Sequence, residues 1–212
     1  MNAEFQHPRI IRLTHWVNAV ALAIMVTSGL RIYNASPIWG FEIPSVLTLG
    51  GWLAGARMWH FAGMWLFVLN GFVWGAYNIL SRHGRQTTLF RRADLTGILP
   101  TIRFYLRLQK QHPPSGKYNS LQKLAYTTIP LAALGSIASG VAIYWPVQFS
   151  GVTAIFGGYD TARVWHFLFT SFLVIFFLGH LVMVALAGWA NFLSMITGFK
   201  ADSPQQRGSS SQ

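Results

Sequence analysis

The sequence of 212 residues contains no cysteine and only five acidic residues. Without thiols the chain can form no disulfide, hold no thiolate-bound iron–sulfur cluster and use no cysteine nucleophile. Charged residues make up 10% of the chain, against about a quarter in soluble domains, while 52% of the residues are hydrophobic. The scarcity of charge predicts a membrane protein, and no set of catalytic acid–base residues is evident.

Four apolar segments are long enough to cross about 30 Å of hydrocarbon at about 1.5 Å of helix per residue. We place them near residues 13–34, 58–80, 121–145 and 162–190. They predict an all-α fold, an integral membrane four-helix bundle formed by a single domain of residues 1–200. The short mixed segment before the first span does not resemble a cleaved signal peptide, so we expect that span to be retained. Residues 201–212, rich in Ser and Gln, are predicted to be a disordered tail.

The net charge of +11 follows the predicted topology. Only Arg31, Arg57 and Arg163 lie on one side of the four spans, and the other 13 of the 16 Lys and Arg residues lie on the opposite side. This is the positive-inside pattern, which places both termini and the basic loop between helices two and three in the cytoplasm. The charge therefore needs no nucleic-acid partner, and the predicted location is the bacterial inner membrane.

The connections between the spans carry their own predictions. Residues 35–57 are too apolar for a solvated loop, so we expect a short helix or turn on the outer membrane surface, or packing against a partner. Residues 94–108 could form an amphipathic helix at the interface. Pro130 lies inside the third span, where it predicts a kink that neighbouring helices tolerate.

Two nearly identical hexapeptides open the second and fourth spans. They are ARMWHF at residues 56–61 and ARVWHF at residues 162–167. A histidine just inside a membrane helix is costly and usually functional. Because both spans enter the membrane from outside, His60 and His166 are predicted to lie at the same outer depth.

A second pair of histidines emerges from depth and helical phase. His15 is near the inner end of the first span, and His180 follows His166 by 14 residues, which is about 21 Å deeper along a helix. That spacing falls only about 40° short of four whole turns, so the two histidines share one helix face. His15 and His180 thus form an inner pair, beside the outer pair. Bis-imidazole ligation of two b-type haems needs one histidine on each side of each macrocycle, and two such haems make an electron path across the bilayer.

Other interpretations remain open for these histidines. Each one alone could merely bond to a backbone carbonyl, although four at matched depths favour ligation. Zinc fits less well, because no carboxylate or cysteine accompanies either pair and the pairs lie too far apart for one ion. A transporter or scaffold without haem is a further alternative. The remaining histidines lie in polar segments and are predicted to be solvated: His7, His83 and His112.

Arginines accompany the histidines. Arg57 and Arg163 each precede an outer histidine by three residues and so lie on the same helix face. At the outer rim they could pair with haem propionates, and Arg12 could serve similarly below His15. Ordinary interfacial snorkelling is the alternative for each arginine, and the repetition of the outer pair favours the propionate role.

These features together resemble the four-helix dihaem cytochrome b subunits of membrane-bound respiratory complexes. That family includes the gamma subunit of formate dehydrogenase, the cytochrome b subunit of nickel–iron hydrogenases and the thiosulfate reductase cytochrome b. The resemblance covers nearly the whole chain and is carried by RxxHW at residues 12–16, His60, KYNSLQKL at 117–124, the His166 and His180 spacing, and NFxSMITG at 191–198. It implies two haem b groups, the outer one held by His60 and His166 and the inner one by His15 and His180.

The resemblance also implies an electron-transfer subunit rather than a catalytic one. Such a subunit anchors a periplasmic oxidoreductase, of the molybdenum enzyme or hydrogenase type, and connects it to the membrane quinone pool. The family's quinone-contacting segment maps to Asn119, Leu121 and Gln122, with Leu121 standing where the formate dehydrogenase branch has glycine. The rival hypothesis is a stand-alone dihaem membrane oxidoreductase that couples quinone to superoxide or another external acceptor. The partner's substrate, the direction of electron flow and the oligomeric state are not predicted.

Overall fold

The computed structural model describes residues 3–81, 92–105, 107–111, 113 and 119–201. The chain divides into two compact units. The first, here called the terminal unit, contains residues 1–74 and 175–212, and the second, the central unit, contains residues 75–174.

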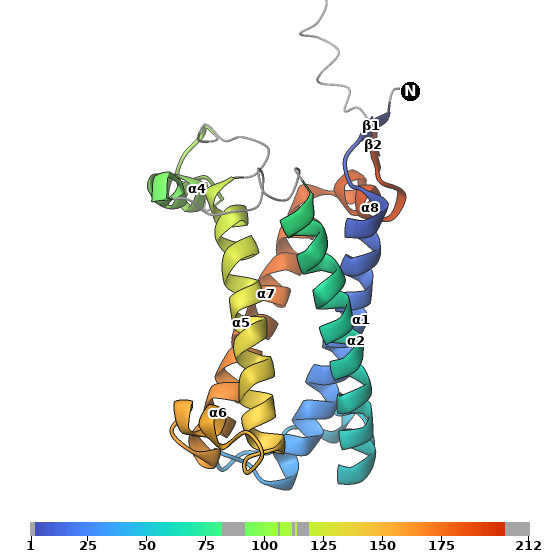
Figure 1. The fold of residues 1–212 in the computed structure, drawn as a ribbon. Coiled ribbons are helices and arrows are strands. Elements are labelled where there is room, and N and C mark those ends of the chain that lie inside the picture. Colours follow the sequence, from blue (N-terminus) through green and yellow to red (C-terminus); the bar gives the residue numbers. More distant parts are fainter. Residues whose placement is uncertain (1–2, 82–91, 106, 112, 114–118, 202–212) are drawn as a thin grey trace, which may run out of the picture. The chain divides into compact units, whose positions relative to one another are not determined.

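Four long helices dominate the chain (Figure 1). They are α1 (Arg9–Ala35), α2 (Leu53–Leu80), α5 (Ser120–Tyr144) and α7 (Tyr159–Ala187). Each is long and apolar enough to cross a membrane, so the prediction of an all-α protein with four spans is confirmed. The helices begin one to five residues before the predicted spans, because the residues that precede each apolar run also take up helical conformation.

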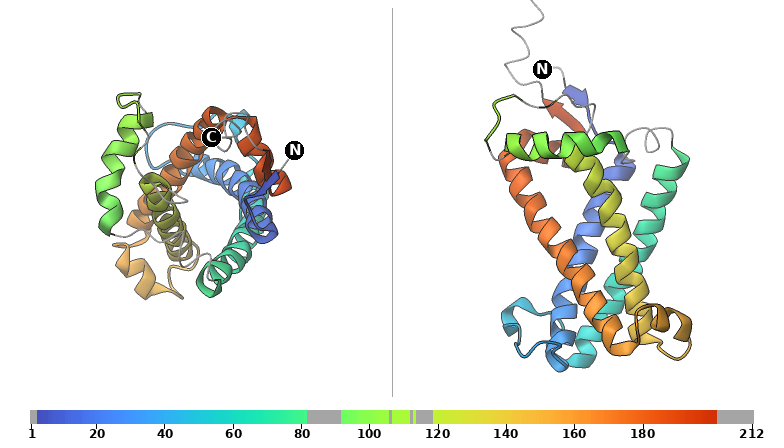
Figure 2. Two further views of the ribbon diagram at one scale, coloured as in Figure 1. Left: turned by 90° about the horizontal axis from the view of Figure 1, so that it is seen from above. Right: turned by 90° about the vertical axis from the view of Figure 1, so that its left-hand side faces the viewer.

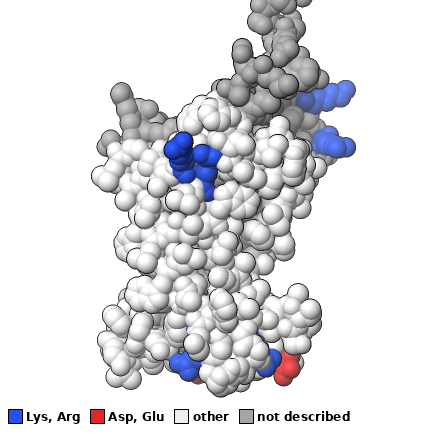
Figure 3. Space-filling view, turned by 90° about the vertical axis from the view of Figure 1, so that its right-hand side faces the viewer, with Lys and Arg blue, Asp and Glu red and all other residues white. Residues whose placement is uncertain are grey.

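The distribution of charge along these helices fits a lipid environment. Their charged residues lie only near the helix ends: Arg9, Arg12 and Arg31 in α1, Arg57 in α2, Lys123 in α5, and Asp160 and Arg163 in α7. Figure 3 shows one face on which the Lys and Arg side chains lie towards the two ends and the middle carries none. Large apolar side chains such as Leu131 and Ile175 are 62% and 68% exposed. Contact of such an apolar surface with water is unfavourable, whereas contact with lipid is not. The chain is a multi-pass membrane protein.

In the terminal unit the two ends of the described chain meet. Strand β1 (Ala3–Phe5) pairs antiparallel with β2 (Phe199–Ala201), and the Phe5 and Phe199 rings contact edge to face. The pair lies beside α8 (Trp189–Thr197) (Figure 1). This short strand pair was not predicted, because each segment alternates apolar and polar residues over only 3 residues, and a recognisable strand signal needs about four to eight.

The predicted end of the fourth span was wrong by a few residues. Helix α7 stops at Ala187, and Gly188 has a φ of 86°, a conformation that other residues rarely adopt. The chain turns there and starts α8 as a separate helix. Apolar residues continue through the turn, so hydropathy alone carried the predicted span to residue 190.

In the central unit α4 (Leu95–Tyr105) packs across the start of α5 (Figure 2). It follows the short 3-10 helix η2 (Arg92–Asp94) and confirms the helix predicted at residues 94–108, at reduced length. Helix α5 runs through Pro130 without a break. The connection between α1 and α2 holds a 3-10 turn, η1 (Ser45–Leu47), and the connection between α5 and α7 holds a short helix, α6 (Ser150–Ile155).

Some predictions concern residues outside the described ranges. They include the tail beyond Ala201 and part of the basic loop, with Arg82, His83, Arg85, Arg91, His112 and Lys117. The disorder of the tail, the single domain of residues 1–200 and the cytoplasmic side of both termini therefore stay predictions.

Candidate cofactor site at the membrane histidines

The inner pair of histidines comes together in the terminal unit. His15 on α1 and His180 on α7 have ring centroids 5.9 Å apart, with an interplanar angle of 65°. Two metal–nitrogen bonds of about 2.0–2.1 Å each would place the two ligating nitrogens about 4 Å apart. Because each ring centre lies further from the metal than its nitrogen, the observed separation fits two imidazoles that share one metal ion.

Aromatic side chains pack against both of these rings. Phe176 stacks on His180 with ring centroids 6.1 Å apart, and Trp16 meets His15 edge to face at 5.4 Å. The indole nitrogen of Trp16 also donates to the carbonyl oxygen of Met195 in α8, at 3.2 Å. These contacts restrict the rotation of the two imidazoles and tie the N-terminal part of α1 to α8.

His60 on α2 is held by groups of α1 within the terminal unit. Its Nδ1 lies 3.1 Å from the carbonyl oxygen of Met25 and 3.2 Å from Oγ of Ser28. The Ser28 hydroxyl donates its own proton to the carbonyl of Ile24 at 2.6 Å, so its oxygen accepts from the ring. Both neighbours of Nδ1 are then acceptors, which assigns the proton of the neutral imidazole to Nδ1 and the lone pair to Nε2.

His166 on α7 has the same surroundings within the central unit. Its Nδ1 lies 2.9 Å from the carbonyl oxygen of Ser136 and 3.2 Å from Oγ of Ser139, both on α5. The Ser139 hydroxyl donates to the carbonyl of Gly135 at 2.7 Å. His166 is therefore also the tautomer with its proton on Nδ1 and its lone pair on Nε2.

The hexapeptide repeat is therefore accompanied by a repeated Ser-Gly dipeptide on the neighbouring helix, which the sequence analysis did not identify. Each serine is followed by a glycine, Gly29 or Gly140, and a Cβ built on either glycine would lie 3.4 Å from Cε1 of the histidine. The Ser-Gly pairs stand 32 and 27 residues before His60 and His166. The occurrence of one Ser-Gly pair in the first span and one in the third span was the sequence signal that could have indicated these contacts.

The donor chemistry fits haem better than a closed metal site. No group of three or more His, Asp or Glu residues within the described ranges could hold a metal ion, whereas a structural zinc needs four ligands. Haem brings four of its own ligands and asks the protein for one or two. Neutral imidazoles whose Nδ1 donates to a carbonyl or hydroxyl present Nε2 as the ligating atom, as in most metal-bound histidines.

The arginines predicted beside the haems occupy distinct environments. Arg163 lies 3.9 Å from Asp160, whose side chain is 91% exposed, so this ion pair is weak. Arg57 stands at the matching position of α2. Arg12 donates through Nη1 to the carbonyl of Ile196 in α8, while its Nε is buried and has no acceptor within the part of the chain that the structure describes. That orphaned N–H fits an acceptor from outside the protein, such as a propionate.

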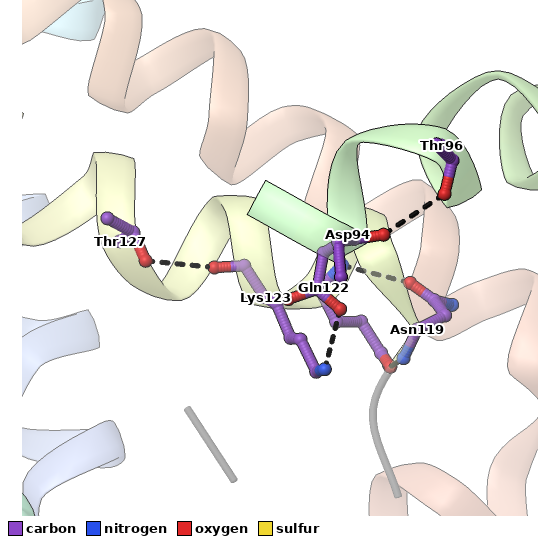
Figure 4. A network of polar contacts seen from close by, with 7 residues as sticks. Asp94, Thr96, Asn119, Gln122, Lys123 and Thr127 are labelled. Carbon is purple, nitrogen blue, oxygen red and sulfur yellow. Dashed lines mark hydrogen bonds and ion pairs between the residues drawn. The ribbon is translucent and has the colours of Figure 1, made fainter. Parts of the chain in front are cut away.

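The residues predicted to contact quinone have capping roles in the structure (Figure 4). Asn119 Oδ1 accepts from the Gln122 backbone N–H at 2.9 Å, and Gln122 Oε1 accepts from the Asn119 N–H at 3.0 Å. This capping box starts α5 and satisfies backbone donors that would otherwise be unpaired. Asn119 Nδ2 also donates to the Tyr105 hydroxyl, and Lys123 pairs with Asp94 at 2.7 Å. A quinone contact at this segment stays a prediction.

Comparison with known proteins agrees with this chemistry. Residues 6–198 match the family model described as prokaryotic cytochrome b561. A relative from Azospira oryzae, named as a protein-methionine-sulfoxide reductase subunit (YedZ1), is 41% identical over 192 residues, 91% of this chain and 96% of the relative. A relative from Cupriavidus necator, named as a nickel–iron hydrogenase B-type cytochrome subunit, is 26% identical over 85% of this chain and 78% of its own length. No solved structure matches. The chain belongs to the prokaryotic cytochrome b561 family, whose members are membrane cytochromes that bind b-type haem.

Proposed function

We propose that the chain is a membrane-anchoring dihaem cytochrome that carries electrons between an oxidoreductase partner on the outer side and quinone in the membrane. The observation that carries the proposal is the pair His15 and His180, which come from opposite ends of the sequence and face each other at 5.9 Å. Histidines are rare within membrane helices and, when buried there in facing pairs, they mark a functional site.

Under this proposal His15 and His180 hold the inner haem, and His60 and His166 hold the outer one. The outer pairing rests on the equal sequence position of His60 in α2 and His166 in α7, each seven residues after the first residue of its helix, and on the matching hydrogen bonds of the two Nδ1 atoms. Bound haem supplies reversible one-electron transfer between ferric and ferrous iron. The protein ligates each iron and keeps its apolar surroundings dry.

The arginines would neutralise the propionates. Arg57 and Arg163 lie one turn before the outer ligands, and Arg12 offers its buried Nε near the inner ligand His15. A guanidinium binds a carboxylate through charge-assisted hydrogen bonds that are stronger than neutral ones. These three residues would therefore help to retain the haems and raise their reduction potentials.

The partner is proposed from the relatives. The names of these relatives describe subunits of a reductase and of hydrogenases, which are both oxidoreductases. The higher identity, over nearly all of both chains, is to the reductase subunit, so we assign a periplasmic reductase that acts on methionine sulfoxide. Electrons would then flow outward from quinol, through the inner haem and the outer haem, to the partner. Asn119 and Gln122 mark the segment where quinol would approach, with their side chains capping α5.

Spectroscopy on the purified full chain tests the cofactor. A dithionite-reduced minus oxidised spectrum should show b-type haem bands, and a pyridine haemochrome assay should give two haems per chain. Absence of b-type bands would favour a transporter or scaffold without haem, and one haem per chain would refute the dihaem proposal.

Co-purification tests the partner. Affinity purification from native membranes should recover a reductase subunit in stoichiometric amount, and a quinol analogue should reduce both haems. Turnover of an external acceptor by the isolated chain, with no copurifying subunit, would instead support the stand-alone oxidoreductase.

A further inference from the structure

The two outer histidines share an arrangement that the two inner histidines lack. Each outer imidazole has two acceptors within hydrogen-bond distance of Nδ1, a backbone carbonyl and a serine hydroxyl. His15 and His180 form no hydrogen bond with any residue that the structure describes, and their contacts are with aromatic rings and with each other. The outer histidines therefore have polar surroundings at Nδ1, the ring nitrogen that would not bind the metal, whereas the inner histidines have aromatic surroundings.

The two serines are placed for this contact. Ser28 and Ser139 are both fully buried, with 0% of their surface exposed. Back-bonding of a hydroxyl to the carbonyl four residues earlier is common in membrane helices and is also seen here at Thr27 and Thr128. What distinguishes Ser28 and Ser139 is that the same oxygen also accepts from a histidine ring on a neighbouring helix.

Hydrogen-bond donation from Nδ1 has a known electronic effect. An acceptor at Nδ1–H draws the proton away from the ring, which makes the imidazole a stronger base at Nε2. A stronger basic ligand stabilises ferric iron more than ferrous iron, so the reduction potential falls. Two acceptors at each ring strengthen this effect, and under the proposed function the outer haem would receive it from both His60 and His166.

We propose that Ser28 and Ser139 are positioning residues that fix the tautomer of the outer ligands and lower the reduction potential of the outer haem. This inference rests on the proposed ligation of the outer haem by His60 and His166. The carbonyls of Met25 and Ser136 supply part of the effect and cannot be removed by substitution, whereas each serine hydroxyl can.

The chain offers matched controls on the same helices. For Ser139→Ala the control is Thr128→Val, which removes a hydroxyl that back-bonds to the Leu124 carbonyl but lies outside the contact with His166. For Ser28→Ala the control is Thr27→Val, which removes a hydroxyl that back-bonds in the same way but lies outside the contact with His60. Each control removes a back-bonded hydroxyl from the same helix without altering the hydrogen bonds to the ring.

The test is a redox titration of the purified holoprotein, combined with electron paramagnetic resonance of the ferric state. Ser28→Ala and Ser139→Ala should each retain two haems, raise the midpoint potential of one haem only, and change the g values of that same haem. The double variant should give a larger shift than either single variant. Thr128→Val and Thr27→Val should leave both midpoints and both signals in place.

Two results overturn the inference. One is an unchanged outer midpoint in both single variants with two haems bound, and the other is an equal shift in the control variants. If Ser139→Ala loses haem, the midpoint potential of the outer haem in Ser28→Ala becomes the deciding measurement. Loss of haem in both variants would show that the serines retain the cofactor rather than set its potential, which also overturns the inference. Wild-type protein without two b-type haems refutes the proposed function instead, so the two failures are separable.

Discussion

Gly135 on α5 and Phe169 on α7 fit together because the glycine has no side chain. A Cβ at position 135 would lie 2.7 Å from Cζ of Phe169 and 2.8 Å from two further ring atoms. In the terminal unit the sizes are exchanged, since Gly63 on α2 lies against Ile24 on α1. Ile24 and Gly135 each stand four residues before the serine that contacts histidine, and Gly63 and Phe169 each stand three residues after that histidine. The two helix pairs therefore follow one packing plan, with a large and a small residue interchanged.

We predict that Gly135→Ala destabilises the protein by about 1–3 kcal/mol, the usual cost of overpacking. The Phe169 ring cannot move away easily, because it stacks on Trp165 with ring centroids 5.7 Å apart. Thermal unfolding in detergent, followed by haem absorbance and circular dichroism, measures the loss. Phe169→Leu in the same chain should recover most of it, since residues in contact show coupled effects.

The control for this prediction is Gly71→Ala. A Cβ at Gly71 meets no atom within 4 Å, so the substitution should not destabilise the protein, and the higher helix propensity of alanine should stabilise it by up to about 1 kcal/mol. Equal destabilisation by Gly71→Ala and Gly135→Ala would show that the contact with Phe169 does not set the result.

Single histidine variants should fall into two groups, according to which haem each one loses. His15→Ala and His180→Ala should each remove the inner haem, and His60→Ala and His166→Ala should each remove the outer one, because bis-imidazole ligation fails without either ligand. Haem content and the midpoint of the remaining haem identify which site is lost. Variants of one pair should leave the same midpoint behind. If His166→Ala loses neither haem, or leaves the same haem as His15→Ala, the pairing is wrong.

The sequence singled out the four membrane histidines but not the groups that contact two of them, for physical reasons. Histidine in a membrane segment is rare enough that four of them carry information, and helical phase relates His166 to His180 by arithmetic alone. Serine in a membrane helix is common and usually bonds within its own helix, so the contact of Ser139 with His166 depends on how α5 and α7 pack.

Two other features show where sequence patterns were informative but unused. Asn119 followed three residues later by Gln122 is the sequence signature of a capping box, although the family resemblance implies a quinone contact at the same residues. Gly188 inside an apolar run was the one local signal that α7 ends and α8 begins. Hydropathy reports the free energy of transferring side chains from water to lipid, so it does not detect a backbone turn made of apolar residues.

Asn70 is predicted to hold the helix of the inner ligand in place. It is 8% exposed within α2, and its Nδ2 donates to the Thr14 carbonyl at 2.8 Å and to Asn18 Oδ1 at 2.6 Å. Asn70→Leu should cost about 1–2 kcal/mol, the range found for polar contacts between membrane helices. Since Thr14 precedes His15 directly, we also expect lower occupancy of the inner haem than of the outer one. Leu69→Ala, at a residue 60% exposed, is the control. Unchanged stability and equal haem loss at both sites would contradict this role.

Arg12 is predicted to serve two functions that one variant can separate. Its Nη1 donates to the Ile196 carbonyl at the end of α8, and its buried Nε is available for an inner-haem propionate. In Arg12→Ala the loss of the first contact should expose the β1–β2 pair, so trypsin should cleave after Lys200 about fivefold faster, which corresponds to about 1 kcal/mol. The loss of a cation beside the propionates removes stabilisation from the ferrous state, so the inner midpoint should fall. Arg9→Ala removes an exposed arginine from the same end of α1 and should change neither quantity. Faster cleavage with an unchanged inner midpoint would show that Arg12 only holds α8 through the Ile196 carbonyl, and the inner propionates would then need another cation.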